Sequence, residues 1–409
     1  AYCEISTTLL FTVSSLYLYI RFLIQLCENR CSFLSVDRFG LSPDLNYPTI
    51  SLSYIEMSLQ QESHRPHHRF GNPFKMILSP KGSYLSPKLL ALLNSFEETL
   101  AGRLKSLKPG GKEDILGLSW MKQAISTLCA VHTDVKTLIT DLELPVSDWD
   151  EKWIGVYLDN SLRMLDMCVA YSSEISRLSQ GHLYLQCSLH NLDGSSTQFM
   201  KARSSLDGWK QHINAKNHRL ENCFAILDGL TESLNLPKIK NSAKGKVLMH
   251  AMYGVRVATV FICSIFAVAF SGSAAKLKDL QVRETCLWTE AFVDLRDFIS
   301  GEIRGIYSGG KFTALKELEA LDVSVKKIYP VIQDGVDPID AAQLELLTSD
   351  LTKKTEIFSV GLDLLAKETD KFFQILLTGR DALLCNLRVG SAVVKPAHPN
   401  KNVHKQMVK

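Results

Sequence analysis

The nearest approach to a catalytic motif in this chain is residues 305–311, which read GIYSGGK. The spacing matches the phosphate-binding loop GxxxxGK[ST], but Phe312 stands where that loop needs a hydroxyl to hold magnesium. The residues before it have the pattern of a helix, whereas the loop follows a strand. The glycines are therefore interpreted as the end of a helix. Gly245 and Lys246 fail as well, because Lys240 and Val247 occupy the positions of the first glycine and the hydroxyl.

Histidines and cysteines offer no recognisable site. His64, His67 and His68 could bind a metal, but a flexible tail that carries histidines explains them better. His182 and His190 lie eight residues apart on one expected helix, without an HExxH motif. No CxxC, GxSxG or dinucleotide fingerprint occurs. We predict no catalytic residue, no cofactor site and no metal site. The ten cysteines stand singly, which favours a reducing compartment; they are Cys3, Cys27, Cys31, Cys129, Cys168, Cys187, Cys223, Cys263, Cys286 and Cys385.

Composition narrows the classes of partner. Lys and Arg number 46 and Asp and Glu 43, so the formal net charge is +3. A balance this close gives no long-range field for nucleic acid, and we expect none to bind. Ser147 is expected to cap a helix, and Asp148 and Asp150 follow it in the first turn. Carboxylates there stabilise the positive end of the helix, so we do not interpret them as a catalytic pair.

The two ends of the chain differ from its middle. Residues 1–56 precede the first methionine, Met57, and contain an apolar stretch at 5–26. We interpret them as upstream sequence absent from the mature protein, the alternative being a signal anchor or membrane span. Residues 57–87 are polar and basic, and we expect disorder there, with Ser86 as the cap of a helix that begins at Pro87. Residues 391–409 are expected to form a disordered basic tail.

The middle of the chain, residues 88–390, has the apolar spacing of helices. Between Val146 and Tyr329 the only proline is Pro237, and no run alternates as a strand would. We predict an all-α fold, an elongated bundle of long antiparallel helices, with a bend near Gly181 and an interruption near Gly361. The expected helices cover residues 88–107, 114–140, 148–192, 197–214, 219–234, 241–271, 288–307, 313–332 and 337–388.

One segment is far more apolar than the others. Residues 257–275 carry no charge, and 257–270 are almost wholly apolar. About 20 such residues are needed to cross a bilayer, so a buried helix at the centre of the bundle is preferred over a span or a helix inserted in the membrane surface. In the membrane alternative, the residues that contact lipid are Val257, Val260, Phe261, Ile262, Ile265, Phe266, Val268 and Phe270, and those that face headgroups are Lys238, Lys240, Lys244 and Lys246.

Several islands of sequence together resemble the plant BYPASS family, which regulates root and shoot development. The resemblance extends in order from Phe70 to Arg388. The islands are FGNPFKMILSPKGSYLSP (70–87), LSWMKQAISTLC (118–129), TLITDLELPVSDWDEKW (137–153), QGHLYLQCSLHNL (180–192), LPKIKNSAKGKVLMHAMYGV (236–255) and FFQILLTGRDALLCNLR (372–388).

The resemblance implies a non-catalytic protein that restrains a root-derived mobile signal which inhibits growth. It implies no enzymatic activity, no cofactor and no catalytic residue. It also implies an intracellular, membrane-associated location in the endomembrane system or the plastid, with the cytoplasm as the alternative. Partners are expected to be proteins bound through helical surfaces, with membrane contact. Two other functions stay open: an adaptor in exocytosis or vesicle tethering, and a carrier or enzyme for an apolar metabolite.

Overall fold

A computed structural model describes residues 85–111, 115–143, 151–192, 196–215, 217–234, 242–273, 277–309, 315–333 and 341–393. All of them belong to the second of two compact units, residues 70–409. The predictions made for residues 1–84 and 394–409 lie outside this part of the chain.

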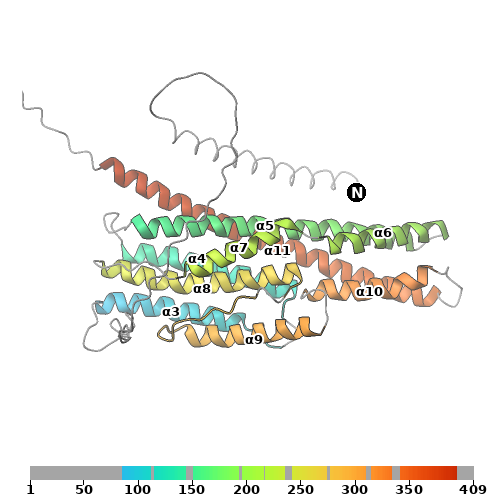
Figure 1. Cartoon of the computed structure of the whole chain (residues 1–409), viewed down its shortest axis with the longest axis horizontal. Coiled ribbons are helices and arrows are strands. Elements are labelled where there is room, and N and C mark those ends of the chain that lie inside the picture. Colours follow the sequence, from blue (N-terminus) through green and yellow to red (C-terminus); the bar gives the residue numbers. More distant parts are fainter. Residues whose placement is uncertain are drawn as a thin grey trace, which may run out of the picture. The chain divides into compact units, whose positions relative to one another are not determined.

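Within the described residues, all regular structure is helical, which confirms the predicted all-α fold (Figure 1). The helices run from Pro87 to Val393, slightly beyond the predicted 88–390. Their bounds are α3 Pro87–Leu107, α4 Leu118–Leu142, α5 Glu151–Leu192, α6 Ser196–Asn214, α7 His218–Glu232, α8 Ala243–Ser271, α9 Thr289–Ser308, α10 Lys316–Gln333 and α11 Ala341–Val393.

Local signals set several of these bounds. Ser86 accepts a hydrogen bond from the Leu89 amide and Pro87 opens α3, as predicted. Helix α4 begins later than expected, because Leu116 has a left-handed backbone with φ 58° and Gly117 is the cap. The expected interruption at Gly361 was wrong, since α11 continues through that position.

Gly181 and Gly361, where a bend and an interruption were expected, lie where two helices pack closely together. A Cβ on Gly361 would lie 2.7 Å from Leu118 Cδ1 and 3.0 Å from Leu118 Cβ. A Cβ on Gly181 would lie 3.0 Å from His212 Cδ2, on the neighbouring α6. Both positions thus let a long helix approach its neighbour.

Helix α8 lies at the centre of the bundle (Figure 1), where it packs against α3, α4, α5 and α7. Helix α11 covers α4 and α5, and α9 packs on α3. Short connections return the chain from α5 to α6 and from α10 to α11, and both pairs pack together, so these neighbours are antiparallel. The central apolar helix predicted from the sequence is therefore present.

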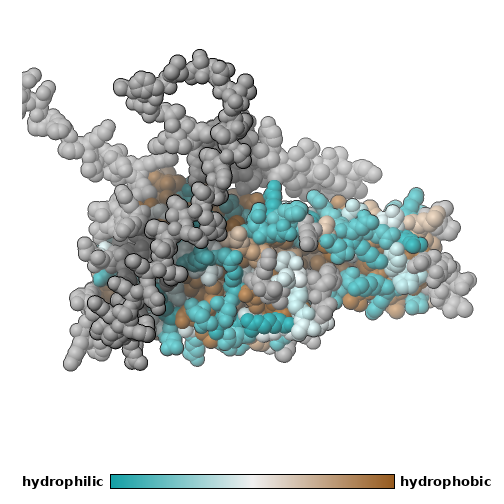
Figure 2. Space-filling model, in the orientation of Figure 1, coloured by the Kyte–Doolittle hydropathy of each residue, from teal (hydrophilic) through white to brown (hydrophobic). Residues whose placement is uncertain are grey.

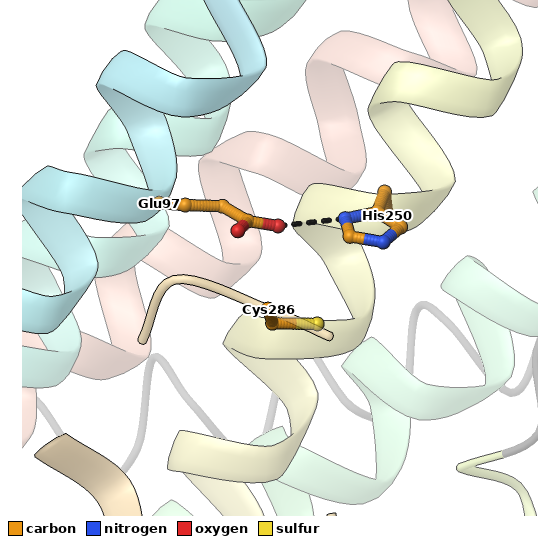
Figure 3. A group of neighbouring side chains, drawn as sticks. All are labelled: Glu97, His250 and Cys286. Atoms are coloured by element: carbon orange, nitrogen blue, oxygen red, sulfur yellow. Dashed lines mark ion pairs between the residues drawn. The ribbon is translucent and has the colours of Figure 1, made fainter. Parts of the chain in front are cut away.

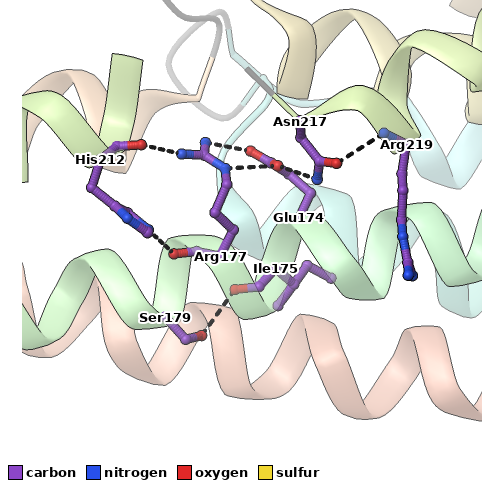
Figure 4. Close-up of polar contacts among 7 residues, drawn as sticks. All are labelled: Glu174, Ile175, Arg177, Ser179, His212, Asn217 and Arg219. Carbon is purple, nitrogen blue, oxygen red and sulfur yellow. Dashed lines mark hydrogen bonds and ion pairs between the residues drawn. The ribbon is translucent and has the colours of Figure 1, made fainter. Parts of the chain in front are cut away.

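A polar network around the buried Glu174 carboxylate fixes the junction of α5, α6 and α7 (Figure 4). Arg177 makes two contacts with the Glu174 carboxylate, at 2.9 and 2.6 Å, and donates to the His212 carbonyl. His212 Nε2 lies 2.7 Å from the Arg177 carbonyl. Asn217 donates to Glu174 and caps α7 by accepting from the Arg219 amide. One carboxylate thus holds the end of α6 and the start of α7 on α5.

The outside of the bundle is mixed in polarity. Figure 2 shows mostly hydrophilic residues over the described part of the face in view, with smaller hydrophobic areas between them. This agrees with the near balance of basic and acidic residues over the whole chain.

Replacing Gly361 by alanine tests the close approach of α11 to α4. We expect a loss of about 1–3 kcal/mol from overpacking, larger than the ~1 kcal/mol gained from helix propensity. Gly301 in α9 is the control, because a Cβ there meets nothing within 4 Å. Gly301→Ala should stabilise by about 0.5–1 kcal/mol in urea denaturation. Stabilisation by both substitutions would contradict the packing.

Removing the Glu174 carboxylate tests the network in Figure 4. Glu174→Ala leaves the mostly buried Arg177 without its ion pair, and we expect a loss of about 3 kcal/mol in the free energy of unfolding. The matched control is Asp159→Ala, which removes an exposed ion pair with Arg163 at 2.9 Å. That change should cost less than about 1 kcal/mol. If chemical denaturation gives the same loss of unfolding free energy for both variants, the network stabilises the fold no more than an exposed ion pair does.

Candidate functional site along the central helix

Helix α8 is almost entirely apolar, but it carries a few polar side chains, and each of those described below faces a polar group of another element. It is the only helix in the described part of the chain that is long and apolar enough to cross a membrane, and 94% of its most apolar window is buried inside the bundle. His250, Arg256 and Thr259 are buried along it. Their partners come from α3, α7 and α4, so the polar groups of α8 are matched to this bundle.

His250 belongs to a buried cluster with Glu97 of α3 and Cys286, which precedes α9 (Figure 3). Glu97 Oε1 and His250 Nδ1 are 2.7 Å apart, although the pair is not aligned as a hydrogen bond. The other carboxylate oxygen of Glu97 accepts from the Leu287 amide at 2.7 Å. The ligand atoms of Glu97, His250 and Cys286 all lie within 4.8 Å of one another.

A thiol, an imidazole and a carboxylate are also the members of a thiol hydrolase triad, but this cluster lacks a reactive thiolate. Burial, and then the Glu97 carboxylate, raise the pKa of Cys286 to about 12. Reactive cysteines have depressed pKa values and are partly accessible, whereas Cys286 is 6% exposed. The arrangement therefore does not support nucleophilic catalysis.

Arg256 lies 5% exposed between α8 and the end of α7. Its Nη2 donates to Ser233 Oγ at 2.6 Å, and Ser233 is the residue that ends α7. The carbonyl end of a helix carries partial negative charge, which favours a cation there. Burial, and then the nearby Arg163, lower the pKa of Arg256 to about 10, so it stays charged near neutral pH.

Thr259 joins α8 to α4. Its hydroxyl donates to the Val255 carbonyl at 2.7 Å, so its oxygen is an acceptor for His132 Nε2, 3.1 Å away. The His132 ring also packs edge-on against Phe372 of α11, with centroids 5.3 Å apart. Burial lowers the pKa of His132 to about 4, so the ring is neutral at physiological pH.

The eight side chains expected to contact lipid are all buried in the bundle, Phe270 being the most exposed of them at 9%. Contact with a membrane would therefore require the bundle to open, and it stays a prediction. Of the expected headgroup lysines, Lys244 donates to the Glu143 carbonyl at the end of α4 and Lys246 is half-buried. Lys238 and Lys240 lie outside the described residues.

The histidines and the glycine-rich segment noted in the sequence do not form a functional site in the described residues. His182 is buried and His190 exposed, so they do not share a site. Gly309 caps the end of α9, as expected for the GIYSGGK segment. The cluster of Glu97, His250 and Cys286 was missed, because its members are far apart in sequence and follow no spacing template. The available signal was a carboxylate and an imidazole on strongly apolar helical stripes, where polar groups need partners.

The half-buried, neutral His132 predicts a pH effect on stability. Its pKa of about 4 in the folded state lies below the ordinary 6.5, so the unfolded state binds the proton more tightly. The contribution of the neutral His132 ring to the free energy of unfolding is fully present above pH 6.5, and it is lost as the pH falls towards 4. The upper limit is about 3 kcal/mol, and partial exposure should reduce it.

Urea denaturation of wild type and His132→Gln at several pH values checks this effect. The stability difference between the two proteins should shrink between pH 7 and pH 4. Parallel stability curves over that window would exclude His132 as the titrating group.

Comparison with known proteins places the chain in a family. The profile of the family described as Protein BPS1 matches residues 125–385. Protein BPS1, chloroplastic, of Arabidopsis thaliana is 52% identical over 84% of this chain and 97% of the relative. UPF0496 protein 4 of Oryza sativa subspecies japonica is 35% identical over 83% of this chain and 99% of the relative. No solved structure matches. With the resemblance to the BYPASS family thus confirmed, the chain belongs to the BPS1 family.

Proposed function

We propose that this protein is a non-catalytic regulator of root and shoot development which restrains production of a root-derived mobile signal that inhibits growth. The observation that carries the proposal is the 52% identity to Protein BPS1, chloroplastic, over 97% of that relative. A match over 84% of this chain is much longer than a single motif, which supports a common role for the two proteins.

The chemistry of the described residues supports a role without catalysis. Burial is the first cause of raised pKa values at Cys129, Cys223, Cys263 and Cys286, each to about 12. Thiols of this kind act as small apolar side chains rather than nucleophiles.

Regulation would then work through surfaces that bind other proteins. On α11, Ile357, Val360 and Leu364 are exposed and share one helical face, because they are three and four residues apart. Apolar residues at this spacing fit an amphipathic helix of a partner protein. We propose that such a partner binds there.

The location we propose is an intracellular membrane surface, in the plastid or the endomembrane system. The relative from Arabidopsis thaliana is named chloroplastic, and α8 is long enough to enter a bilayer. Since α8 is buried, attachment to the membrane surface is favoured over a span. Carbonate washing of membranes that hold the tagged protein should release it, whereas retention until detergent is added would contradict surface attachment.

The surface of the bundle gives no support to the alternative function, a carrier or enzyme for an apolar metabolite. A surface groove of about 260 Å³ lies between α3, α4 and α11. Arg103 and Asp134 in this groove pair with each other at 2.7 Å, so their charges are already matched. The groove is also open to solvent, whereas a carrier or enzyme for an apolar metabolite would need an enclosed pocket. The other alternative, an adaptor in exocytosis or vesicle tethering, predicts that secretory proteins co-purify with this chain.

Complementation tests the developmental role. In Arabidopsis plants that lack Protein BPS1, chloroplastic, expression of this chain should restore root and leaf growth. If the protein restrains a mobile signal from the root, expression limited to a grafted rootstock should also restore growth of the deficient shoot. If growth is restored only when the shoot itself expresses the chain, the hypothesis that the protein restrains a mobile signal from the root is wrong.

The surface of α11 can be tested in the same plants with the double variant Ile357→Glu, Val360→Glu. It should fold normally by circular dichroism but fail to restore growth. The control is Val323→Glu in α10, another exposed apolar position. Full restoration by the α11 variant would exclude that face as the partner surface.

A further inference from the structure

We propose that Glu97, His250 and Cys286 form a zinc-binding site that joins α3, α8 and the segment before α9. Three different ligand atoms, a carboxylate oxygen, an imidazole nitrogen and a thiol sulfur, converge within 4.8 Å in the core (Figure 3). Each comes from a different element, so the tertiary fold alone brings them together. This inference is independent of the proposed function.

The present geometry is close to that of a zinc site. Zinc bond lengths of about 2.0–2.3 Å in a tetrahedral arrangement place ligand atoms about 3.3–3.6 Å apart. Glu97 Oε1 and His250 Nδ1, now 2.7 Å apart, would have to separate by roughly 0.6 Å. No separation within the cluster exceeds 4.8 Å, so each separation from the sulfur would have to shorten by no more than about 1.2 Å to reach 3.6 Å. Rotation of side chains can supply shifts of this size.

The chemistry of the ligands selects zinc among the common divalent cations. Magnesium and calcium prefer oxygen ligands throughout, whereas a set of sulfur, nitrogen and oxygen suits zinc. Zinc binding would release the Cys286 proton, because the ligand is the thiolate. The two charges of Zn²⁺ would then be balanced by the Glu97 carboxylate and the Cys286 thiolate. A neutral site of this kind suits the core better than an isolated charge.

The surroundings hold the ligands in place. The Leu287 amide donates to Glu97 Oε2, which leaves Oε1 directed towards His250. Hydrogen bonds of this kind orient the ligands of metal sites. The Trp288 ring packs on Tyr253 and Phe292, with centroids 5.8 and 5.9 Å apart. The three ligand residues are themselves buried, so a zinc ion bound to them would cross-link three segments of the core and stabilise the fold.

The alternative is that Glu97 and His250 form a buried ion pair and Cys286 fills space. The two cases differ in what removal of the thiol does. Loss of Cys286 leaves an ion pair intact but removes a zinc ligand. Cys263 is the matched control, since it is also buried with its pKa raised to about 12 but lies on α8 outside the cluster.

The experiment uses the full chain without a purification tag and with His64, His67 and His68 replaced by alanine, so that these histidines do not bind metal. After incubation with zinc and dialysis, elemental analysis should find about one zinc per chain. Cys263→Ala should keep this content, whereas Cys286→Ala should lose at least nine-tenths of it. A parent protein without bound zinc, or equal zinc contents in the two variants, would overturn the proposal.

Cobalt substitution provides a readout that does not depend on the variants folding. Cobalt bound by a thiolate gives a charge-transfer absorption band in the near ultraviolet. The parent chain and Cys263→Ala should show this band on titration with cobalt, and Cys286→Ala should not. If Cys286→Ala fails to fold, the parent chain still decides, because absence of the band there would exclude a thiolate ligand.

Discussion

Helix α8 is apolar on nearly every side, so it is stable in water only where protein covers its whole circumference. That constraint organises the bundle. Helices α3, α4, α5 and α7 surround it, and α9 and α11 pack on those in turn. Side chains such as Phe261, Ile265 and Phe266 are fully buried, and each contributes about 1.5–3 kcal/mol relative to exposure. The other helices can be amphipathic because α8 supplies the surface that their apolar stripes cover.

Polar contacts make this apolar core specific. Apolar surfaces alone would tolerate rotation or sliding of α8, because they lack direction. Pairing of His250 with Glu97, Arg256 with Ser233 and Thr259 with His132 fixes its rotation against α3, α7 and α4. An unpaired polar group in the core would cost about 1–3 kcal/mol, so other arrangements are disfavoured. The same contacts give the His250 imidazole and one nitrogen of Arg256 a polar partner within the most apolar of the described helices.

The described side chains agree with the proposed role as a regulator that binds other proteins. The buried cysteines are protonated and enclosed, and the charges of the groove near Arg103 are internally paired. On α11, the apolar side chains of Ile357, Val360 and Leu364 are exposed, and the proposed partner would bind there. The Glu97, His250 and Cys286 cluster fits the same view, since its location in the core is one where a metal would stabilise the bundle rather than act on a substrate.

Sequence alone determined the helical class, the position of the apolar helix and the caps at Ser86 and Gly309, because propensity, periodicity and capping are local properties. It also carried the family resemblance. It misread Gly361, because a glycine in a helical pattern has the same appearance whether it breaks the helix or lets a neighbour such as Leu118 approach. The burial of α8 by protein and the meeting of Glu97, His250 and Cys286 were decided by tertiary structure. Both depend on contacts between residues far apart in the chain, which no local spacing records.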